Sequence, residues 1–144
     1  MTPIWIDTRE EYAYAKSRGY EPLADPRFEI DHALRVSLQR ERFGTGHTPE
    51  ENERFYRFCW EHKPHRCEEC MRPLREYSAT FVSHILTRGA HPEMAHDCRN
   101  VNILCFAHHN RWEHATTRGG MRIYCRNQQV IEKLKQEYYN SEQQ

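Results

Sequence analysis

Two pairs of metal-binding residue types lie near the middle of this 144-residue chain. They are Cys67 with Cys70 and Cys105 with His108, and two residues separate the members of each pair. Thiolates and imidazoles at this spacing bind zinc, which favours four such ligands in a tetrahedral arrangement. The sequence therefore predicts one structural Zn²⁺ bound by these four side chains.

Other side chains capable of chemistry stand close to these pairs, and a structural zinc ion does not need them. They include His84 and His109. A neutral imidazole can accept a proton near pH 7, which makes His84 a candidate general base. His109 can bind a divalent cation, Mg²⁺ or Mn²⁺, that acts as a Lewis acid on a phosphate group. Together these residues meet two requirements for hydrolysing a phosphodiester bond.

The segment from Cys67 to Trp112, about a third of the chain, resembles the HNH endonucleases. In the zinc-binding branch of that family, a C-x-x-C pair precedes a strand that ends in Asp-His or a similar pair. An Asn then lies five residues before a second C-x-x-C-His. Here Ser83-His84 takes the place of the strand-end pair, and Asn100 lies five residues before Cys105. The resemblance implies a ββα-metal finger that cleaves DNA.

The resemblance also implies roles for individual residues. It implies that Asn100 forms hydrogen bonds across the hairpin and fixes the loop that aims His84. The stretch Ser83–Gly89, with Pro92 and Glu93 after it, is most similar to the phage NinG (Rap) recombination nucleases. That narrower likeness implies branched or recombination-intermediate DNA as the substrate.

Several residues are candidate ligands of the catalytic cation, and their spacing does not decide among them. We assign zinc to His108 because it keeps the two-residue spacing, which leaves His109 for the second ion. Ser83 stands where many relatives have an Asp ligand, and a hydroxyl is a poor substitute for a carboxylate on a hard cation. Glu113 lies four residues after His109, so on a helix both can reach one ion, but it can equally face solvent.

Two arginines near the site are candidates for binding substrate. Arg88 and Arg111 each carry a guanidinium, which can donate two parallel hydrogen bonds to a phosphate. Either of them could bind the phosphate in this way.

A rival metal site has plausible spacing but leaves Cys70 and the Cys105–His108 pair without a role. Its ligands would be Cys59, His62, His65 and Cys67.

The chain is expected to fold as an α+β protein in three segments. Residues 1–62 form a helical extension, with helices from Asp7 to Arg18, from Phe28 to Arg42 and from Thr48 to His62. Residues 63–117 form the zinc-containing finger, and residues 118–144 carry a helix over 127–139. Within the finger, we expect strands over 79–85 and 100–104, a loop over 88–97 and a helix over 105–116.

Composition limits the possible environments and partners. No apolar run is long enough for a membrane span, and no signal peptide begins the chain, so we expect a cytoplasmic protein that does not bind membranes. The net charge is zero, but residues 63–127 contain ten Lys and Arg and six Asp and Glu, a net charge of +4. Such a region favours contact with a phosphate backbone.

Two alternatives to a DNA endonuclease remain at this stage. Because of Ser83, the chain could be a nucleic-acid-binding zinc module whose nuclease centre has decayed. The balanced net charge also fits a structural zinc knuckle in a protein-interaction domain. The N-terminal helices could provide DNA shape recognition or a homodimer surface.

Overall fold

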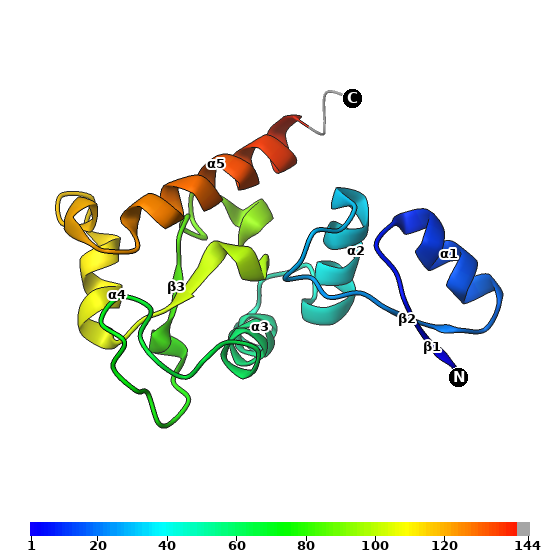
Figure 1. Cartoon of the computed structure of the whole chain (residues 1–144), viewed down its shortest axis with the longest axis horizontal. Helices are drawn as coiled ribbons and strands as arrows, with labels where there is room; N and C mark the ends of the chain where they lie inside the picture. Colours follow the sequence, from blue (N-terminus) through cyan, green and yellow to red (C-terminus); the bar gives the residue numbers. More distant parts are fainter. Residues whose placement is uncertain (141–144) are drawn as a thin grey trace. The chain divides into compact units, whose positions relative to one another are not determined.

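A computed structural model describes residues 1–140 of the chain (Figure 1). This part is a small α+β protein with two two-stranded sheets, which confirms the predicted fold class. Its α-helices are α1 (Arg9–Ser17), α2 (His32–Phe43), α3 (Pro49–Glu61), α4 (Phe106–Glu113) and α5 (Tyr124–Asn140). Its strands are β1 (Pro3–Trp5), β2 (Glu21–Leu23), β3 (Val82–His84) and β4 (Val101–Ile103). None of the helices within residues 1–140 has the length and apolar character that crossing a membrane requires.

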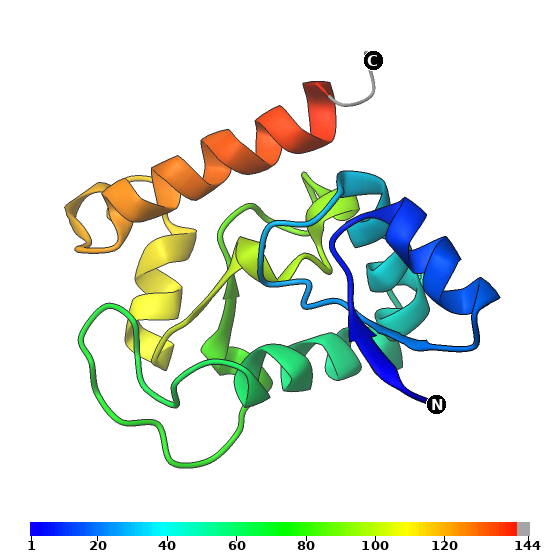
Figure 2. The same ribbon diagram turned by 45° about the vertical axis from the view of Figure 1, so that its right-hand side comes forward.

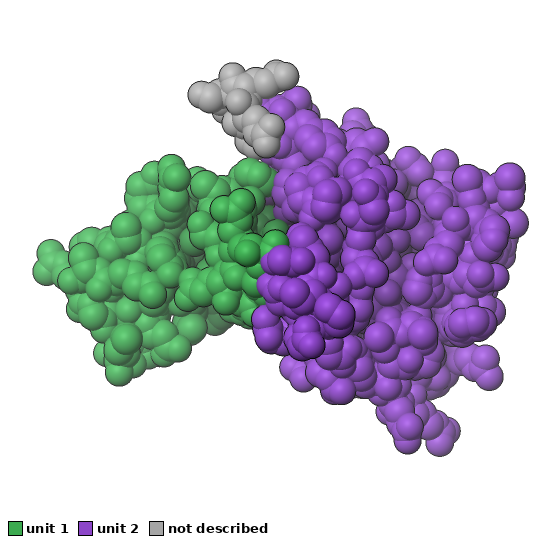
Figure 3. Space-filling view, turned by 180° about the vertical axis from the view of Figure 1, so that it is seen from behind, with its two compact units in different colours: residues 1–45 green, residues 46–144 purple. Residues whose placement is uncertain are grey.

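The chain divides into two compact units, residues 1–45 and residues 46–144 (Figure 3). The division lies before α3, so this helix belongs to the second unit and not to an N-terminal extension that ends at residue 62. It packs against β3 and against the 3-10 turn Ala79–Phe81. Packing between segments that are far apart in the chain leaves no local signal in the sequence. This explains why the predicted boundary, at residue 62, differs from the division between residues 45 and 46.

Unit 1 pairs β1 with β2 in parallel, and α1 connects the two strands. We expected only helices here, because strands of three residues are too short to show a period. The core contains Ile6, Ala15 and Leu34. The cap of α1 is Thr8, whose hydroxyl accepts a hydrogen bond from the Glu11 amide, so the helix begins at Arg9 and not at Asp7 as predicted.

Helix α2 begins four residues later than expected, at His32. The reason is a cap at Asp31, whose carboxylate accepts a hydrogen bond from the Leu34 amide. Helix α3 in unit 2 starts as predicted. Thr48 and Glu51 accept hydrogen bonds from each other's backbone amides, which satisfies two donors at the helix start.

The centre of unit 2 is an antiparallel hairpin of β3 and β4, followed directly by α4. The register places Val82 opposite Ile103, Ser83 opposite Asn102 and His84 opposite Val101. In Figures 1 and 2, α3 and α5 lie on opposite sides of this hairpin.

Three segments around the hairpin differ from the prediction in their conformation or in their bounds. Residues 79–81 form a 3-10 turn instead of strand, because the Ser78 hydroxyl accepts a hydrogen bond from the Thr80 amide and caps it. Helix α4 ends at Glu113, and α5 starts at Tyr124. The Glu69 carboxylate accepts hydrogen bonds from the amides of Arg122 and Ile123, next to this earlier start.

Candidate metal centre and histidine pocket

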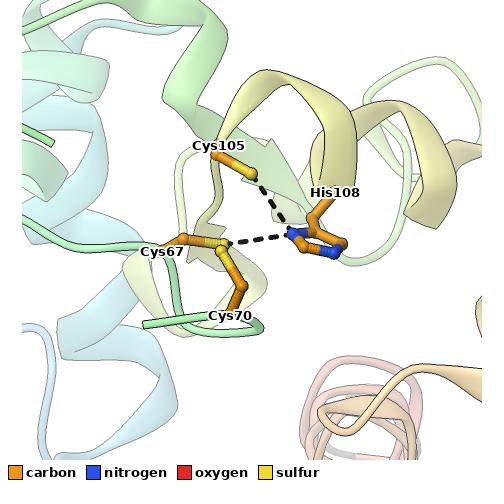
Figure 4. Close-up of side chains that lie close together, drawn as sticks. All are labelled: Cys67, Cys70, Cys105 and His108. Carbon is orange, nitrogen blue, oxygen red and sulfur yellow. Dashed lines mark hydrogen bonds between the residues drawn. The ribbon is translucent and has the colours of Figure 1, made fainter. Parts of the chain in front are cut away.

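The four predicted zinc ligands come together in unit 2 (Figure 4). The ligand atoms of Cys67, Cys70, Cys105 and His108 all lie within 4.8 Å of one another. His108 Nδ1 is 3.7 Å from Cys67 Sγ and 3.2 Å from Cys105 Sγ. Zinc bonds of about 2.0–2.3 Å at tetrahedral angles separate ligand atoms by roughly 3.5–3.8 Å. The group, called here the ligand cluster, can therefore bind a metal ion such as zinc.

Local backbone structure positions each pair of ligands in the cluster. Cys67 and Cys70 lie in a tight turn in which the Met71 amide donates to the Cys67 carbonyl, and Met71 has a positive φ of 64°. Cys105 is the N-cap residue of α4, and His108 lies in the first turn of that helix. The tight turn and the helix start therefore face one another, as Figure 4 shows.

The chemistry of the cluster suits a cation that binds thiolates. Burial raises the pKa of Cys67, but hydrogen bonds from the amides of Cys70, Cys105 and Glu69 outweigh it and bring the pKa to about 7. Burial, together with the neighbouring Cys67 thiol, raises the pKa of Cys105. A bound cation would favour the thiolate form of each cysteine, so metal binding would release protons.

The rival ligand set does not assemble. Within residues 1–140, the ligand cluster is the only group of three or more His, Cys, Asp or Glu side chains with converging ligand atoms. His65 instead stacks on Trp60, with 3.9 Å between ring centroids, and its Nε2 bonds to the Trp60 carbonyl. Cys59 is buried in the core.

A second feature of unit 2 is an open pocket of about 700 Å³, which we call the histidine pocket. Both His84 and His109 line it, as do Glu113 and Arg88. The lining also includes His47, Tyr56 and Arg118, which the sequence did not single out. The pocket thus brings together two candidate catalytic histidines that lie 25 positions apart in the sequence.

His84 is held so that one ring nitrogen can act as a base. Its Nε2 lies 2.9 Å from the Ala95 carbonyl, to which it can only donate, and this leaves Nδ1 without a proton. Burial lowers the pKa of His84 to about 4, and the charges of Arg88 and His109 act in the same direction. The imidazole is therefore neutral at pH 7.

His109 and Glu113 form the expected pair one helical turn apart. His109 Nδ1 donates to the Thr80 carbonyl at 2.5 Å, and Nε2 lies 3.0 Å from Glu113 Oε1. In a neutral ring with its proton on Nδ1, the Nε2 lone pair would face a carboxylate, which is repulsive. A proton or a cation between them removes the repulsion, and a backbone carbonyl on the other ring nitrogen is typical of metal-binding histidines.

Asn100 is fully buried and ties the loop after β3 to the turn before β4. Its Oδ1 accepts a hydrogen bond of 2.8 Å from the Leu86 amide, and its Nδ2 donates to the Leu86 and Met94 carbonyls. The Met94 carbonyl is one residue from Ala95, which holds His84. These contacts are those of a residue that positions the loop.

Ser83 is not placed for the role of cation ligand that we considered for it. Successive residues of a strand point to opposite faces, so Ser83 points away from the pocket that His84 lines. It is fully buried, and its hydroxyl has no hydrogen-bond partner among residues 1–140. Any cation in the histidine pocket would rely on His109 and Glu113.

Of the two predicted phosphate-binding arginines, only Arg88 lines the pocket. Arg111 points elsewhere, and its Nε donates to the Thr117 carbonyl at 3.4 Å. Arg118 lines the pocket in its place, 4.9 Å above the Trp112 ring. His47 and Tyr56 come from α3 and the residues before it, so no spacing in the finger could have indicated them.

Comparison of the chain with protein-family models, with curated proteins and with solved structures found no match.

Proposed function

We propose that this chain is a metal-dependent endonuclease of the HNH type that hydrolyses phosphodiester bonds in DNA. The observation that carries the proposal is the histidine pocket, in which His84 and the His109–Glu113 pair line one open surface. One residue can act as a base and the pair can bind a cation. An open pocket also suits a polymeric substrate, which must lie across the site.

The candidate residues in and beside the pocket then have defined tasks. His84 Nδ1 accepts a proton from the attacking water, because its Nε2 is committed to the Ala95 carbonyl. Asn100 holds the loop that supports this contact. Arg88, which has no ion pair within residues 1–140, is available to bind a phosphate oxygen. When bound at His109 and Glu113, Mg²⁺ or Mn²⁺ would supply Lewis-acid stabilisation of the charge on the phosphate and the leaving oxygen.

Zinc in the ligand cluster has a separate, structural task in this proposal. Four protein ligands close the coordination shell, which leaves no position for water or substrate. Such an ion fixes the first turn of α4, where His108 lies next to His109. The ion would thus hold the helix that carries the cation-binding pair.

The likeness to phage recombination nucleases extends the proposal to branched DNA in a bacterial or phage-infected cell. Cleavage of linear, nicked and four-way-junction DNA in parallel tests this extension. Equal cleavage rates on all three substrates would contradict a preference for branched DNA but would still support an endonuclease.

One observation favours the alternative of a binding module without catalysis. Within residues 1–140, no third His, Cys, Asp or Glu joins His109 and Glu113. However, Mg²⁺ commonly binds through only one or two protein groups and completes its shell with waters and substrate phosphates. A pair such as His109 and Glu113 is therefore compatible with a cation that is completed by waters and substrate.

The test is cleavage of supercoiled plasmid with Mg²⁺ or Mn²⁺. We expect the wild-type protein to nick the plasmid, and His84→Ala to slow cleavage by about 10² to 10⁴, the usual contribution of a general base. His114→Ala is the matched control, because this exposed histidine lies outside the pocket. DNA binding without cleavage by the wild-type protein would favour the binding module instead.

A further inference from the structure

A second hollow of unit 2, of about 380 Å³, lies beside the Cys67–Cys70 turn. We call it the basic hollow, because its lining includes Lys63, Arg66, Arg122 and Arg126, with Glu68 and Met71. Among the residues that the structure describes, Glu68 is the only acidic side chain lining it. Four cations thus face one carboxylate, which leaves an excess of three positive charges on a concave surface.

Glu68 fixes three of these cations in place. Its carboxylate accepts a hydrogen bond of 2.6 Å from Arg126 and lies 3.7 Å from Lys63 Nζ. Its backbone carbonyl accepts a hydrogen bond of 3.0 Å from Arg122. Side chains that are ordered beforehand lose less conformational entropy when they bind a ligand. The hollow is therefore a pre-organised cationic surface.

The same carboxylate is itself held by the hairpin. It accepts hydrogen bonds from the Ile103 amide at 2.5 Å and from Asn102 Nδ2 at 3.2 Å. These neutral donors occupy its oxygens without cancelling any positive charge. Glu68 thus acts as an anchor for the cations and cannot neutralise all of them.

Arg66 is the fourth cation, and it differs from the other three. It is exposed, and its side chain forms no hydrogen bond or ion pair within residues 1–140. A guanidinium in this state can donate two parallel hydrogen bonds to the oxygens of a phosphate. It is the best placed group to contact an incoming anion.

The basic hollow and the histidine pocket lie on different faces of the hairpin. Asn102, which contacts Glu68, stands opposite Ser83 and so shares its face. His84 is the next residue along β3 and points to the other face, toward α3. An anion in the basic hollow is therefore distinct from the phosphate that would be cleaved.

We propose that the basic hollow binds a phosphate group of a DNA strand away from the cleaved bond, with Arg66 as the direct donor. Lys63, Arg122 and Arg126 supply the surrounding positive charge. Recognition of phosphate rests on the hollow itself, whereas DNA as the source of the phosphate rests on the proposed function. A contact of this kind positions the DNA and does not read its sequence.

The experiment measures binding of a short fluorescent DNA duplex at several salt concentrations, without added divalent cation so that no cleavage occurs. Arg66→Gln should weaken binding about tenfold at low salt, as for loss of a hydrogen bond to a charged group. The slope of log affinity against log salt should fall in magnitude by about one, as for one lost phosphate contact.

Arg75→Gln is the matched control. Arg75 carries the same charge and is also exposed, but it does not line the hollow. It should change affinity and salt slope far less than Arg66→Gln. Zinc content and thermal stability, measured for both variants, should equal those of the wild-type protein.

Three results of the DNA measurement overturn the proposal: no DNA binding by the wild-type protein, equal losses for the two variants, or no loss for Arg66→Gln. An acidic peptide that loses as much affinity as DNA on Arg66→Gln would indicate a protein partner and also overturn it. Plasmid cleavage, measured in parallel, separates the two proposals. If Arg66→Gln weakens DNA binding, Arg75→Gln does not, and the wild-type protein fails to cleave plasmid, the phosphate site is supported and the nuclease proposal is wrong. If the wild-type protein cleaves plasmid and both variants lose the same affinity, the nuclease proposal is supported and the phosphate site is wrong.

Discussion

The ligand cluster and the histidine pocket use adjacent residues of α4 and yet differ in construction. His108 turns toward three cysteines whose ligand atoms lie within 4.8 Å of one another. His109 turns toward the open pocket, where it meets a single carboxylate. A closed set of four ligands suits a structural ion, whereas an incomplete set leaves room for water and substrate. Removal of one ligand should therefore affect folding in the cluster and turnover in the pocket.

The largest expected effect is on the cluster side. Cys67→Ser should abolish stoichiometric zinc binding and lower the melting temperature sharply, because metal binding contributes directly to folding in small metal-containing units. Metal analysis and thermal denaturation provide the measurement. Cys125→Ser, which changes an exposed cysteine outside the cluster, should keep both properties. A Cys67→Ser protein with full zinc and unchanged stability would refute the ligand assignment.

Substitutions of the proposed cation ligands in the histidine pocket should change the rate of cleavage and its dependence on Mn²⁺. His109→Ala should raise the Mn²⁺ concentration for half-maximal cleavage at least about tenfold, since even residues that only support a ligand cost this much. Glu113→Gln should act in the same direction, and zinc content should stay unchanged in both proteins. Metal titrations of plasmid cleavage are the test. If excess Mn²⁺ rescues His84→Ala and not His109→Ala, the two histidines have exchanged roles.

A smaller effect concerns pH. The pKa of His84 is lowered to about 4, so the base stays neutral well below the usual histidine value of about 6.5. The contribution of His84 to cleavage should be lost as pH decreases toward 4, when its imidazole becomes protonated. Arg88→Gln removes a nearby charge that lowers this pKa, and it should move the His84 titration to higher pH. NMR titration of the imidazole and single-turnover cleavage rates are the measurements.

The same pKa also sets a dependence of stability on pH. Because the folded state holds His84 neutral, its contribution to stability is complete above about pH 6.5 and decreases as pH falls toward 4. Burial lowers the pKa of His96 to about 4 as well, and the charges of His47 and His84 contribute to this. The free energy of unfolding should therefore decrease with acidification across this range.

The smallest effect should come from Ser83→Ala. The buried hydroxyl has no partner, so its removal should leave cleavage unchanged and should change stability by no more than about 1 kcal/mol, in the stabilising direction. Denaturant unfolding and an Mn²⁺ titration of cleavage test this. If this variant requires more Mn²⁺ for cleavage than the wild-type protein, Ser83 contributes to cation binding after all.

The sequence predicted best what depends on local spacing. The pairs Cys67–Cys70 and Cys105–His108 come together in space, and the four-residue step from His109 to Glu113 predicted their contact. The position of Ser83 could also have been deduced, since adjacent residues of a strand cannot both line one pocket.

The rest of the site depends on long-range packing. His47 and Tyr56 reach the pocket only because α3 packs against β3, and Arg118 reaches it after the end of α4. No period or spacing in the chain specifies these contacts. The parallel pairing of β1 with β2 was missed for the different reason that each strand has three residues.

The adjacency of His108 and His109 has a consequence for how a cell could control this protein. If the cluster binds zinc and the pocket performs catalysis, the first turn of α4 depends on one metal and the next residue serves another. A chain made under zinc starvation would then lack a fixed helix for His109, however much magnesium is present. Zinc supply would set the fraction of active molecules, although zinc itself takes no part in the reaction.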